Sequence, residues 1–502
     1  MKLDADLQAI QEVRQRLHEA KAAQKLLETM SQAQIDSIIA AMADAAEREA
    51  VRLGVLACEE TGFGHARDKA AKNRFVAQNV YQAIKEMKTV GIIHRDDSRK
   101  VWEVAQPVGV IAAIIPSTNP TSTVLFKCMI ALKARNAIVI SPHPSALRCS
   151  QEAARVMREA AEASGAPAGL VHCLQQPSME ASRELMTHKL TDLILATGGT
   201  AMVKAAYSSG KPAYGVGPGN VPVYIHHSAK INASVSAIIQ SKTFDYGTIC
   251  ASEQALVVDR SIRSELLHAL KLHGAYVLQE QEKRKVEAVI SVNGGRSLNP
   301  QIVGQSPQKI AEMAGISIPE GTRVLLAEET EVGLAHPFSI EKLSPLLALY
   351  TVEDWQEGCR RCIELLELGG LGHTLGIHCE DQNVIEAFGL EKPASRIVVN
   401  AGTTFGGIGA TTGILPSMTL GCGSFGNNIT SDNIGPMHLL NIKRVAFGIR
   451  EMVTEPPSEP TGSFAAQVQQ LESALQNHGR PDITRDEVMQ IVKRVLAEMQ
   501  LG

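Results

Sequence analysis

Apolar residues recur at helical spacing over residues 7–17, 35–48 and 72–88. Spacing of three and four residues places apolar side chains on one face of a helix, so residues 5–88 are predicted to be mostly helical. The pattern then changes. Two short segments, 90–94 and 100–105, flank a polar turn and predict a β-hairpin arm.

From residue 108 short apolar runs alternate with helical patterns. The expected strands are 108–115, 137–141, 170–174 and 193–196, and the helical patterns are 124–132, 145–164, 179–188 and 201–207. Repeated strand–helix units with continuous apolar strands predict a parallel sheet covered by helices on both faces. Ligands of such sheets bind beyond the carboxyl ends of the strands, so the loops after Ile115, Ile140 and Ala196 are candidate site loops.

A second α/β region is expected over residues 221–435, which gives an α/β fold class with two sheets. Its candidate strands are 221–225, 255–258 and 397–400, whereas the Gly-rich and Thr-rich segment 402–426 is expected to be a loop. Residues 456–462 have the composition of a linker. Beyond them lie a candidate helix at 464–475 and an amphipathic one at 482–499, whose apolar face would comprise Val488, Ile491, Val492, Val495, Leu496 and Met499.

The composition is that of an ordinary globular chain. Its 502 residues are 44% apolar and 20% charged, with a net charge of −4. We therefore expect neither nucleic acid nor a membrane surface as a partner, and no apolar run approaches the ~18 residues of a membrane span. The N-terminal pattern is that of an amphipathic helix and not of a signal peptide. Nine scattered cysteines indicate reduced thiols in a cytosol-like compartment.

Cys250 is the strongest candidate nucleophile. It follows a Gly-Thr turn and precedes the strand expected near Ala255. A thiol at a loop-to-strand junction is accessible and can lie near backbone N–H donors, which suits a nucleophile. The alternative is a small buried hydrophobic side chain, which is the better interpretation for the other eight cysteines.

Two turns that follow expected strands are candidates for binding an oxyanion and a phosphate. The amide of Asn119 can donate to an oxyanion, although Asn is also an ordinary turn residue. Gly198 and Gly199 would let a phosphate approach a helix N-terminus, although such turns are common without a ligand. Residues 215–220 are not a dinucleotide fingerprint, because a strand and not a helix is expected to follow them.

Two further sets of residues have weaker interpretations. Cys359 and Cys362 have C-x-x-C spacing, but they fall in a helical pattern without a second pair, so no metal is expected there. His143 is either a turn residue or a ligand contact.

Taken together, these segments resemble the aldehyde dehydrogenase superfamily and, more narrowly, its coenzyme A-acylating branch. The resemblance spans residues 110–446. The motifs that carry it are IPSTNPTS (115–122), ISPHPSA (140–146), ATGGTAMVKAAYSSGKP (196–212), GVGPGNVP (215–222), TICASEQ (248–254), EKLSPLL (341–347), GGLGHTLGIH (369–378) and NIGPMHLLNIKRVA (433–446).

The resemblance implies a role for each candidate residue. Cys250 would attack the aldehyde carbonyl, and Asn119, with the backbone N–H of Cys250, would stabilise the oxyanion. His373 would lie in a loop near the site. The implied cofactor contacts are Ser141 and His143 at the adenosine, Gly198 and Gly199 at the pyrophosphate, and Glu341 at the nicotinamide ribose. The cofactor is expected to be NAD; NADP stays open because Ser141 stands near the place of the usual ribose-binding Lys.

One departure from the hydrolytic relatives decides the expected reaction. Val216 occupies the position at which those enzymes carry a Glu that activates water, and valine cannot deprotonate water. The expected reaction is therefore reversible oxidation of a short aldehyde, acetaldehyde first, to the acyl-coenzyme A. The alternatives are an acylating enzyme for sulfoacetaldehyde or propionaldehyde, a hydrolytic enzyme, and an inactive scaffold.

The resemblance also divides the chain into parts and suggests partners. The expected parts are a cofactor-binding domain (1–88 and 109–219), a catalytic domain (220–430), an oligomerisation arm (89–108 and 431–450), a linker (451–481) and a C-terminal amphipathic helix (482–502). A homodimer or homotetramer is expected in the cytoplasm. The terminal helix either docks on the body or resembles the peptides that bind the shell of a bacterial microcompartment, which would place the protein inside one.

Overall fold

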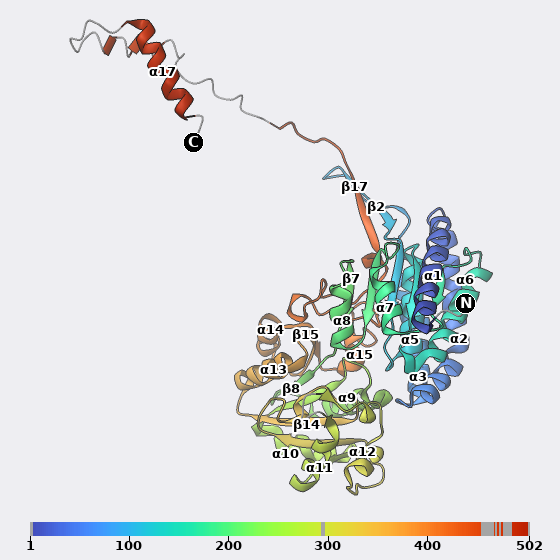
Figure 1. Ribbon diagram of the computed structural model, residues 1–502. Coiled ribbons are helices and arrows are strands. Elements are labelled where there is room, and N and C mark those ends of the chain that lie inside the picture. The colour runs from blue at the N-terminus through green and yellow to red at the C-terminus, as the bar shows by residue number, and fades with distance from the viewer. Residues whose placement is uncertain are drawn as a thin grey trace. The chain divides into compact units, whose positions relative to one another are not determined.

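The computed structural model describes residues 4–292, 297–452, 466, 469–470, 473–474 and 484–499. The chain divides into two units, one of residues 1–97 and 101–445 and the other of residues 98–100 and 446–502. The first unit contains two parallel sheets and the helices around them (Figure 1).

The N-terminal helices and the first sheet form one layered body. The helices are α1 (Ala5–Leu27), α2 (Gln32–Thr61), α3 (Ala66–Phe75) and α4 (Tyr81–Ile84), with a π-helical turn at Val76–Val80. The sheet has the order β5-β4-β3-β6-β7 and is parallel throughout. Its strands are β3 (Val110–Ile114), β4 (Ala137–Ser141), β5 (Val171–Cys173), β6 (Leu193–Thr197) and β7 (Ala213–Val216).

Four helices connect these strands: α5 (Pro120–Lys133), α6 (Leu147–Ala163), α7 (Met179–Thr187) and α8 (Thr200–Tyr207). Helix α2 packs on α3, α5 and α6, and α1 packs on α7. Strands β3 and β4 are buried along their whole length, as continuous apolar runs in a parallel sheet require. Helix α5 begins at Pro120, four residues before the predicted start, because proline suits the first turn of a helix.

The second sheet is also parallel, in the order β10-β13-β14-β9-β8-β15-β16. Its strands are β8 (Val221–Ile225), β9 (Glu253–Asp259), β10 (Ala275–Val277), β13 (Val324–Glu329), β14 (Leu346–Val352), β15 (Gly372–His378) and β16 (Ala394–Val399). Its helices are α9 (Ile231–Thr243), α10 (Arg263–Leu272), α11 (Glu280–Ile290), α12 (Pro307–Ala314), α13 (Trp355–Gly369), α14 (Gln382–Glu391) and α15 (Thr403–Gly407).

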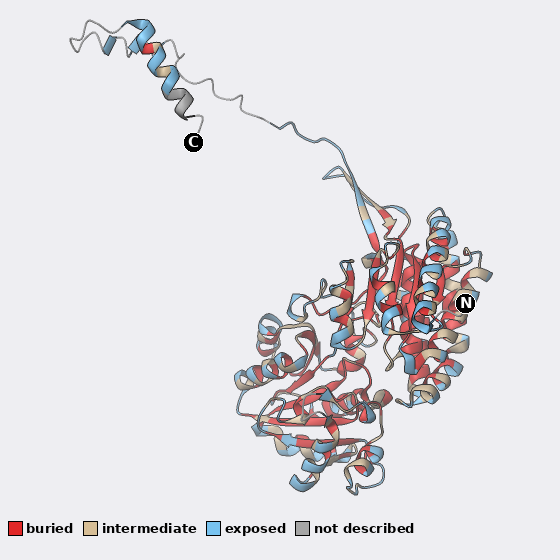
Figure 2. Ribbon diagram, in the orientation of Figure 1, coloured by how far each residue is buried: buried red, intermediate tan, exposed pale blue. Residues whose placement is uncertain are grey.

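Hydrophobic cores lie on both faces of this second sheet. Along β9, Ala255 and Val257 join one buried cluster, while Leu256 and Val258 join another. This alternation is the two-residue period of a strand that is covered on both sides. Figure 2 shows the buried residues concentrated in the strands of the two sheets. The predicted α/β class with parallel sheets is confirmed.

Shorter elements complete the fold. Strands β11 (Ser291–Val292) and β12 (Ser297–Leu298) pair antiparallel. The 3₁₀ turns are η2 (Pro144–Ala146), η3 (Phe244–Gly247), η4 (Arg260–Ile262), η5 (Pro300–Ile302), η6 (Pro337–Ser339), η7 (Ser424–Gly426) and η8 (Pro436–Leu439). The segment 402–426, expected to be a loop throughout, contains the short helix α15. Two backbone N–H groups at the start of this helix donate to Glu253 and Ser241.

A third sheet has the order β1-β2-β17 and corresponds to the predicted arm. Its strands are β1 (Gly91–Asp96), β2 (Val101–Pro107) and β17 (Leu440–Ala446). The first two pair antiparallel, as a hairpin requires. The later part of the arm, expected from 431, becomes a strand only at Leu440. In the second unit the terminal helix α17 is Arg485–Met499, three residues shorter at its start than expected. The linker at 456–462 and the side chains of Val495, Leu496 and Met499 lie outside the described residues.

Candidate functional site

One pocket of about 770 Å³ lies where the carboxyl ends of β3, β4 and β6 face the Cys250 loop. Its wall includes the seven residues predicted from the sequence to be catalytic or to contact the cofactor: Asn119, Ser141, His143, Gly198, Gly199, Cys250 and Glu341. Ser141 ends strand β4, four others come from the loops after β3, β4 and β6, and Cys250 and Glu341 come from loops beside the second sheet. The structure thus brings all seven residues together, while their individual roles stay predictions.

The thiol of Cys250 lies beside a histidine. Cys250 precedes β9 and is half-buried, and its Sγ is 3.2 Å from Nε2 of His373. The expectation that His373 lies in a loop is wrong: it is a buried residue of strand β15. Burial raises the pKa of Cys250 to about 12; Glu341 adds to the rise and Arg396 opposes it. Burial, together with Arg396, lowers the pKa of His373 to about 3. Near neutral pH the pair is therefore a thiol and an uncharged imidazole, and the lowered pKa makes this imidazole a poor proton acceptor.

The raised pKa predicts how Cys250 responds to an alkylating reagent in the absence of ligands. The thiolate is the reactive form, so its alkylation by iodoacetamide should rise about tenfold per pH unit between pH 7 and 9. The measurement is the rate of carboxamidomethylation at Cys250, followed by mass spectrometry of the peptide, with Cys250→Ala as the blank. A rate that levels off near pH 7 would mean that nearby cations, and not burial, set the state of the thiol.

Asn119 is the N-cap residue of helix α5, and its side-chain amide both accepts and donates hydrogen bonds. Its Oδ1 accepts a hydrogen bond of 2.5 Å from Lys72 Nζ. Its Nδ2 donates at 3.1 Å to Thr118 Oγ1 and at 3.4 Å to the backbone carbonyl of Thr248. The second contact is long for a hydrogen bond, so this amide group retains donor capacity for a pocket ligand.

Glu341 and Val216 define the acidic and apolar parts of the wall. The backbone N–H of Gly219 donates to Oε1 of Glu341 at 3.0 Å, and burial raises the pKa of this carboxyl to about 7. Val216 ends β7 and is 3% exposed. Among the described lining residues Glu341 is the sole carboxylate, and none is Lys or Arg.

The other end of the pocket has the features of a nucleotide site. Gly199 is the N-cap of α8, and a Cβ built on it would meet nothing within 4 Å, which leaves room for a ligand at the helix N-terminus. Thr197 Oγ1 is buried without a hydrogen-bond partner and lines the same wall. Ser141 Oγ lies 2.9 Å from Ser182 Oγ. His143 caps the turn η2 through Ser145, and burial lowers its pKa. These residues fit a dinucleotide.

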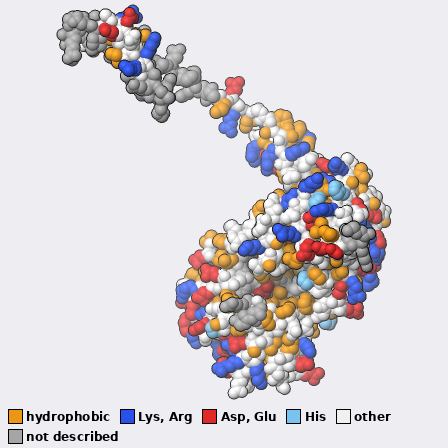
Figure 3. Space-filling view, viewed as in Figure 1, with side chains coloured by type: hydrophobic (Ala, Val, Ile, Leu, Met, Phe, Trp, Pro, Cys, Tyr) orange, Lys and Arg blue, Asp and Glu red, His pale blue; other side chains and the backbone are white. Residues whose placement is uncertain are grey.

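Sequence reasoning did not find the buried cations near the site. Lys72 comes from α3, and Arg396, on β16, donates to the backbone carbonyl of His373 at 2.9 Å. A lone Lys or Arg in a sequence is expected at the surface, and no local signal marks these two as buried. The other charged side chains are mostly at the surface, where both signs are interspersed (Figure 3).

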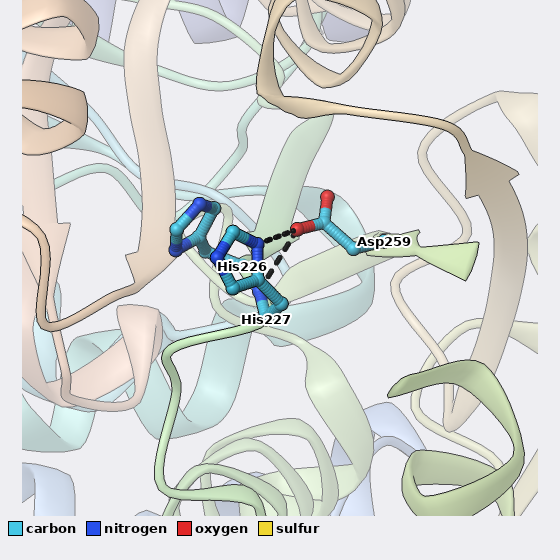
Figure 4. A group of neighbouring side chains, drawn as sticks. All are labelled: His226, His227 and Asp259. Carbon is cyan, nitrogen blue, oxygen red and sulfur yellow. Dashed lines mark hydrogen bonds and ion pairs between the residues drawn. The ribbon is translucent and has the colours of Figure 1, made fainter. Parts of the chain in front are cut away.

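A second titratable cluster lies at the ends of β8 and β9, outside the pocket. His226, His227 and Asp259 place nitrogen and carboxylate atoms within 4.8 Å of one another (Figure 4). Hydrogen bonds already use the carboxylate: Oδ1 accepts from Tyr224, and Oδ2 accepts from the backbone N–H of His227 and contacts its ring at 3.0 Å. The cluster ties the two strand ends together.

Comparison with known proteins places the chain among enzymes of one family. Residues 5–329 match the model of the aldehyde dehydrogenase family. The bifunctional aldehyde-alcohol dehydrogenase AdhE of Escherichia coli K12 is 45% identical over 438 residues, which are 86% of this chain and 49% of that protein. The chain therefore spans about half the length of this curated relative.

Two solved structures resemble most of the chain. An acetylating aldehyde dehydrogenase from Geobacillus thermoglucosidasius is 66% identical, with a TM-score of 0.89 over 90% of this chain and 100% of that one. A propionaldehyde dehydrogenase from the fucose-utilisation microcompartment of Clostridium phytofermentans is 27% identical, with a TM-score of 0.79 over 87% and 97% of the two chains.

Proposed function

The chain belongs to the aldehyde dehydrogenase family, and on this basis we propose that it oxidises a short-chain aldehyde to the acyl-coenzyme A through a thioester on Cys250. One observation carries the proposal: Cys250 and Asn119 share a pocket in which Val216 supplies no base for water. The names of similar proteins support it, since one is an acetylating and another a propionaldehyde dehydrogenase.

The first half of the reaction uses three side chains. Cys250 Sγ attacks the carbonyl carbon as the thiolate and releases its proton, while His373 Nε2, 3.2 Å from Sγ, helps to hold the sulfur in place. The carbonyl oxygen becomes an oxyanion, which Asn119 Nδ2 stabilises by donating a hydrogen bond. A bound nicotinamide supplies the hydride acceptor. Loss of the hydride restores the carbonyl and leaves the acyl group as a thioester on Cys250.

The second half transfers the acyl group. The thiol of coenzyme A loses its proton and attacks the thioester carbon, and Asn119 again stabilises the oxyanion. Collapse of this intermediate breaks the bond to Cys250 and releases the acyl-coenzyme A. The aldehyde, NAD⁺ and coenzyme A thus yield the acyl-coenzyme A, NADH and a proton, and every step is reversible.

Product analysis tests this proposal. Incubation with acetaldehyde, NAD and coenzyme A should yield acetyl-coenzyme A in an amount equal to the NADH formed, with acetate a minor product. Chromatography of both acyl products, with the absorbance of NADH, gives the balance. Acetate equal to the NADH would identify a hydrolytic enzyme, and no NADH at all would identify an inactive scaffold.

The charge of the pocket wall predicts which cofactor and aldehyde are preferred. A 2′-phosphate or a sulfonate needs a cation, and the described part of the wall offers neither Lys nor Arg. We expect kcat/KM to be at least ~10-fold higher for NAD than for NADP, and for acetaldehyde than for sulfoacetaldehyde. The kcat/KM for propionaldehyde, which has one more methylene than acetaldehyde, should be closer to that for acetaldehyde. A higher kcat/KM for NADP than for NAD, or for sulfoacetaldehyde than for acetaldehyde, would contradict this prediction.

The third sheet supports an oligomer as part of the proposal. On β1 the side chain of Ile92 is 38% exposed, and on β17 that of Val445 is 42% exposed. Exposed apolar residues on strands suit pairing with another copy. We therefore place the arm (89–108 and 431–450) at the contact of a homodimer or homotetramer.

The terminal helix α17 supports a more specific location. Its Ile491 is 60% exposed, which suits an apolar face that docks on a partner helix or groove. No helix in the described part of the chain is long and apolar enough to cross a membrane. We place the protein in the cytoplasm, inside a bacterial microcompartment, with a shell protein as the partner of this helix.

Deletion of residues 463–502 tests the role of the helix. Activity should stay within about twofold of the full chain, because the residues of the pocket lie outside the deleted segment. Co-localisation with co-expressed shells, measured by fluorescence of a fused reporter, should be lost. Lost activity with unchanged localisation would instead make the helix part of the enzyme body.

A further inference from the structure

Two buried lysines of helix α3 lie behind the wall of the Cys250 pocket and bind residues of its loops. Lys69 and Lys72 lie three residues apart on one helix face and are 3% and 2% exposed. A buried ammonium group is unfavourable unless it is paired and hydrogen-bonded. Each lysine is therefore expected to have specific hydrogen-bond partners. These partners lie in the two pocket loops that contain Asn119 and Cys250.

Asp245, in the turn that leads to Cys250, is the shared partner of these lysines. Its Oδ2 accepts from Lys72 and, at 3.1 Å, from Lys69, and Thr248 Oγ1 donates to it at 2.7 Å. Burial raises the pKa of Asp245, but the charges of Lys72 and Lys69 outweigh it, so the pKa lies below its usual value. One carboxylate thus pairs with two ammonium groups, and although burial lowers the pKa of Lys72 to about 8, Lys72 stays mostly charged near pH 7.

Lys72 uses all three of its N–H donors. One goes to Asp245, one to Thr248 Oγ1 at 3.0 Å, and one to Asn119 Oδ1 at 2.5 Å. An ammonium group only donates, so the atom of the Asn119 amide that faces Lys72 must be the oxygen. The NH₂ group then points away from Lys72. Lys69 does not contact Asn119: besides Asp245, it donates to the backbone carbonyl of Thr118 at 3.0 Å.

We propose that Lys72 is a positioning residue that fixes the amide of Asn119 with its NH₂ group toward the oxyanion formed on Cys250. This inference rests on the proposed function and deepens it. The positive charge of Lys72 beside Oδ1 also polarises the amide and makes its N–H a stronger donor. Helix α3 thereby couples the oxyanion donor to the loop of the nucleophile.

The local backbone supports this coupling. Asp245 and Tyr246 have φ of 48° and 50°, in the left-handed region that residues with a side chain rarely adopt. The contacts of Asp245 hold this turn, which lies a few residues before Cys250. Glycine at position 64 lets the backbone there lie against the carboxylate of Asp245, because a Cβ on Gly64 would lie 1.8 Å from Asp245 Oδ1.

A double-mutant cycle tests the proposal on the full chain. Asn119→Ala, Lys72→Met and the double variant are compared by kcat and by KM for acetaldehyde. We expect Lys72→Met to lower kcat about 10- to 100-fold with KM changed less than threefold. The double variant should be no slower than Asn119→Ala alone, because Lys72 acts through Asn119. Losses that multiply, or a Lys72→Met variant as fast as wild type, would overturn the proposal.

Two further variants separate this role from a structural one. Lys69→Met removes an equally buried cation from Asp245 but leaves Asn119 Oδ1 bound, so its loss of kcat should be smaller and should multiply with that of Asn119→Ala. If Lys72→Met does not fold by circular dichroism, Lys72→Gln takes its place: its amide N–H can still donate to Asn119 Oδ1, so its loss of kcat should be smaller than that of Asn119→Ala and should not multiply with it. A wild type that forms no NADH from aldehyde would refute the proposed function, an outcome distinct from a failed cycle.

Discussion

Replacement of Cys250 by alanine should lower aldehyde-dependent NADH formation by about 10⁴-fold or more. The reason is that the thioester cannot form without Sγ, and no other thiol lines the pocket among the described residues. Substrate binding should survive, because alanine preserves the backbone N–H at this position. The measurement is NADH absorbance with saturating acetaldehyde, NAD and coenzyme A, together with NAD binding by calorimetry.

Cys359→Ala is the matched control for this loss. Cys359 is a buried cysteine on α13 and does not line the pocket. Its replacement should leave turnover within a few-fold of wild type. Turnover by Cys250→Ala within tenfold of wild type would show that another group forms the covalent intermediate or that none is formed.

Replacement of Asn119 by alanine should lower kcat by about 10²- to 10³-fold, with a small change in KM for the aldehyde. The amide donates to an oxygen that carries full negative charge only in the transition state and intermediate, so its loss affects kcat first. Pre-steady-state measurement of the NADH burst would locate the loss in the first half of the reaction.

Asn119→Asp provides the near-isosteric control. An ionised carboxylate only accepts hydrogen bonds, and it would pair with Lys72 in place of the amide oxygen. We expect it to be at least as slow as Asn119→Ala, because it places negative charge beside the oxyanion. An active Asn119→Asp variant would mean that the amide donates nothing to the reaction.

Pattern reasoning located the pocket because parallel sheets constrain where loops meet. Asn119 and Gly198 follow apolar strands and Ser141 ends one, and the carboxyl ends of neighbouring strands share one edge. The turn before Cys250 was found by a different signal, a small-residue junction before β9. Strand order alone does not bring Cys250 and Glu341, which lie beside the second sheet, to this edge; the resemblance to the aldehyde dehydrogenase family joined them to the other residues.

Other parts of the fold depend on contacts that the local sequence does not record. Strand β15 is buried although it contains His373 and His378, so its polarity hides it from an apolar-run search. Helix α15 forms from Gly and Thr because distant Glu253 and Ser241 accept its first N–H groups. The Lys72–Asp245 pair joins residues 173 positions apart, which no local pattern can reveal.

The measurement that tests the central claim most directly is NADH formation from acetaldehyde and NAD with and without coenzyme A. Without a base at Val216 the thioester on Cys250 should persist, so NADH without coenzyme A should stop near one equivalent per chain. Addition of coenzyme A should restore sustained turnover. Equal sustained turnover without coenzyme A would contradict the acylating mechanism and would make Glu341, the sole carboxylate among the described lining residues, the candidate base for water.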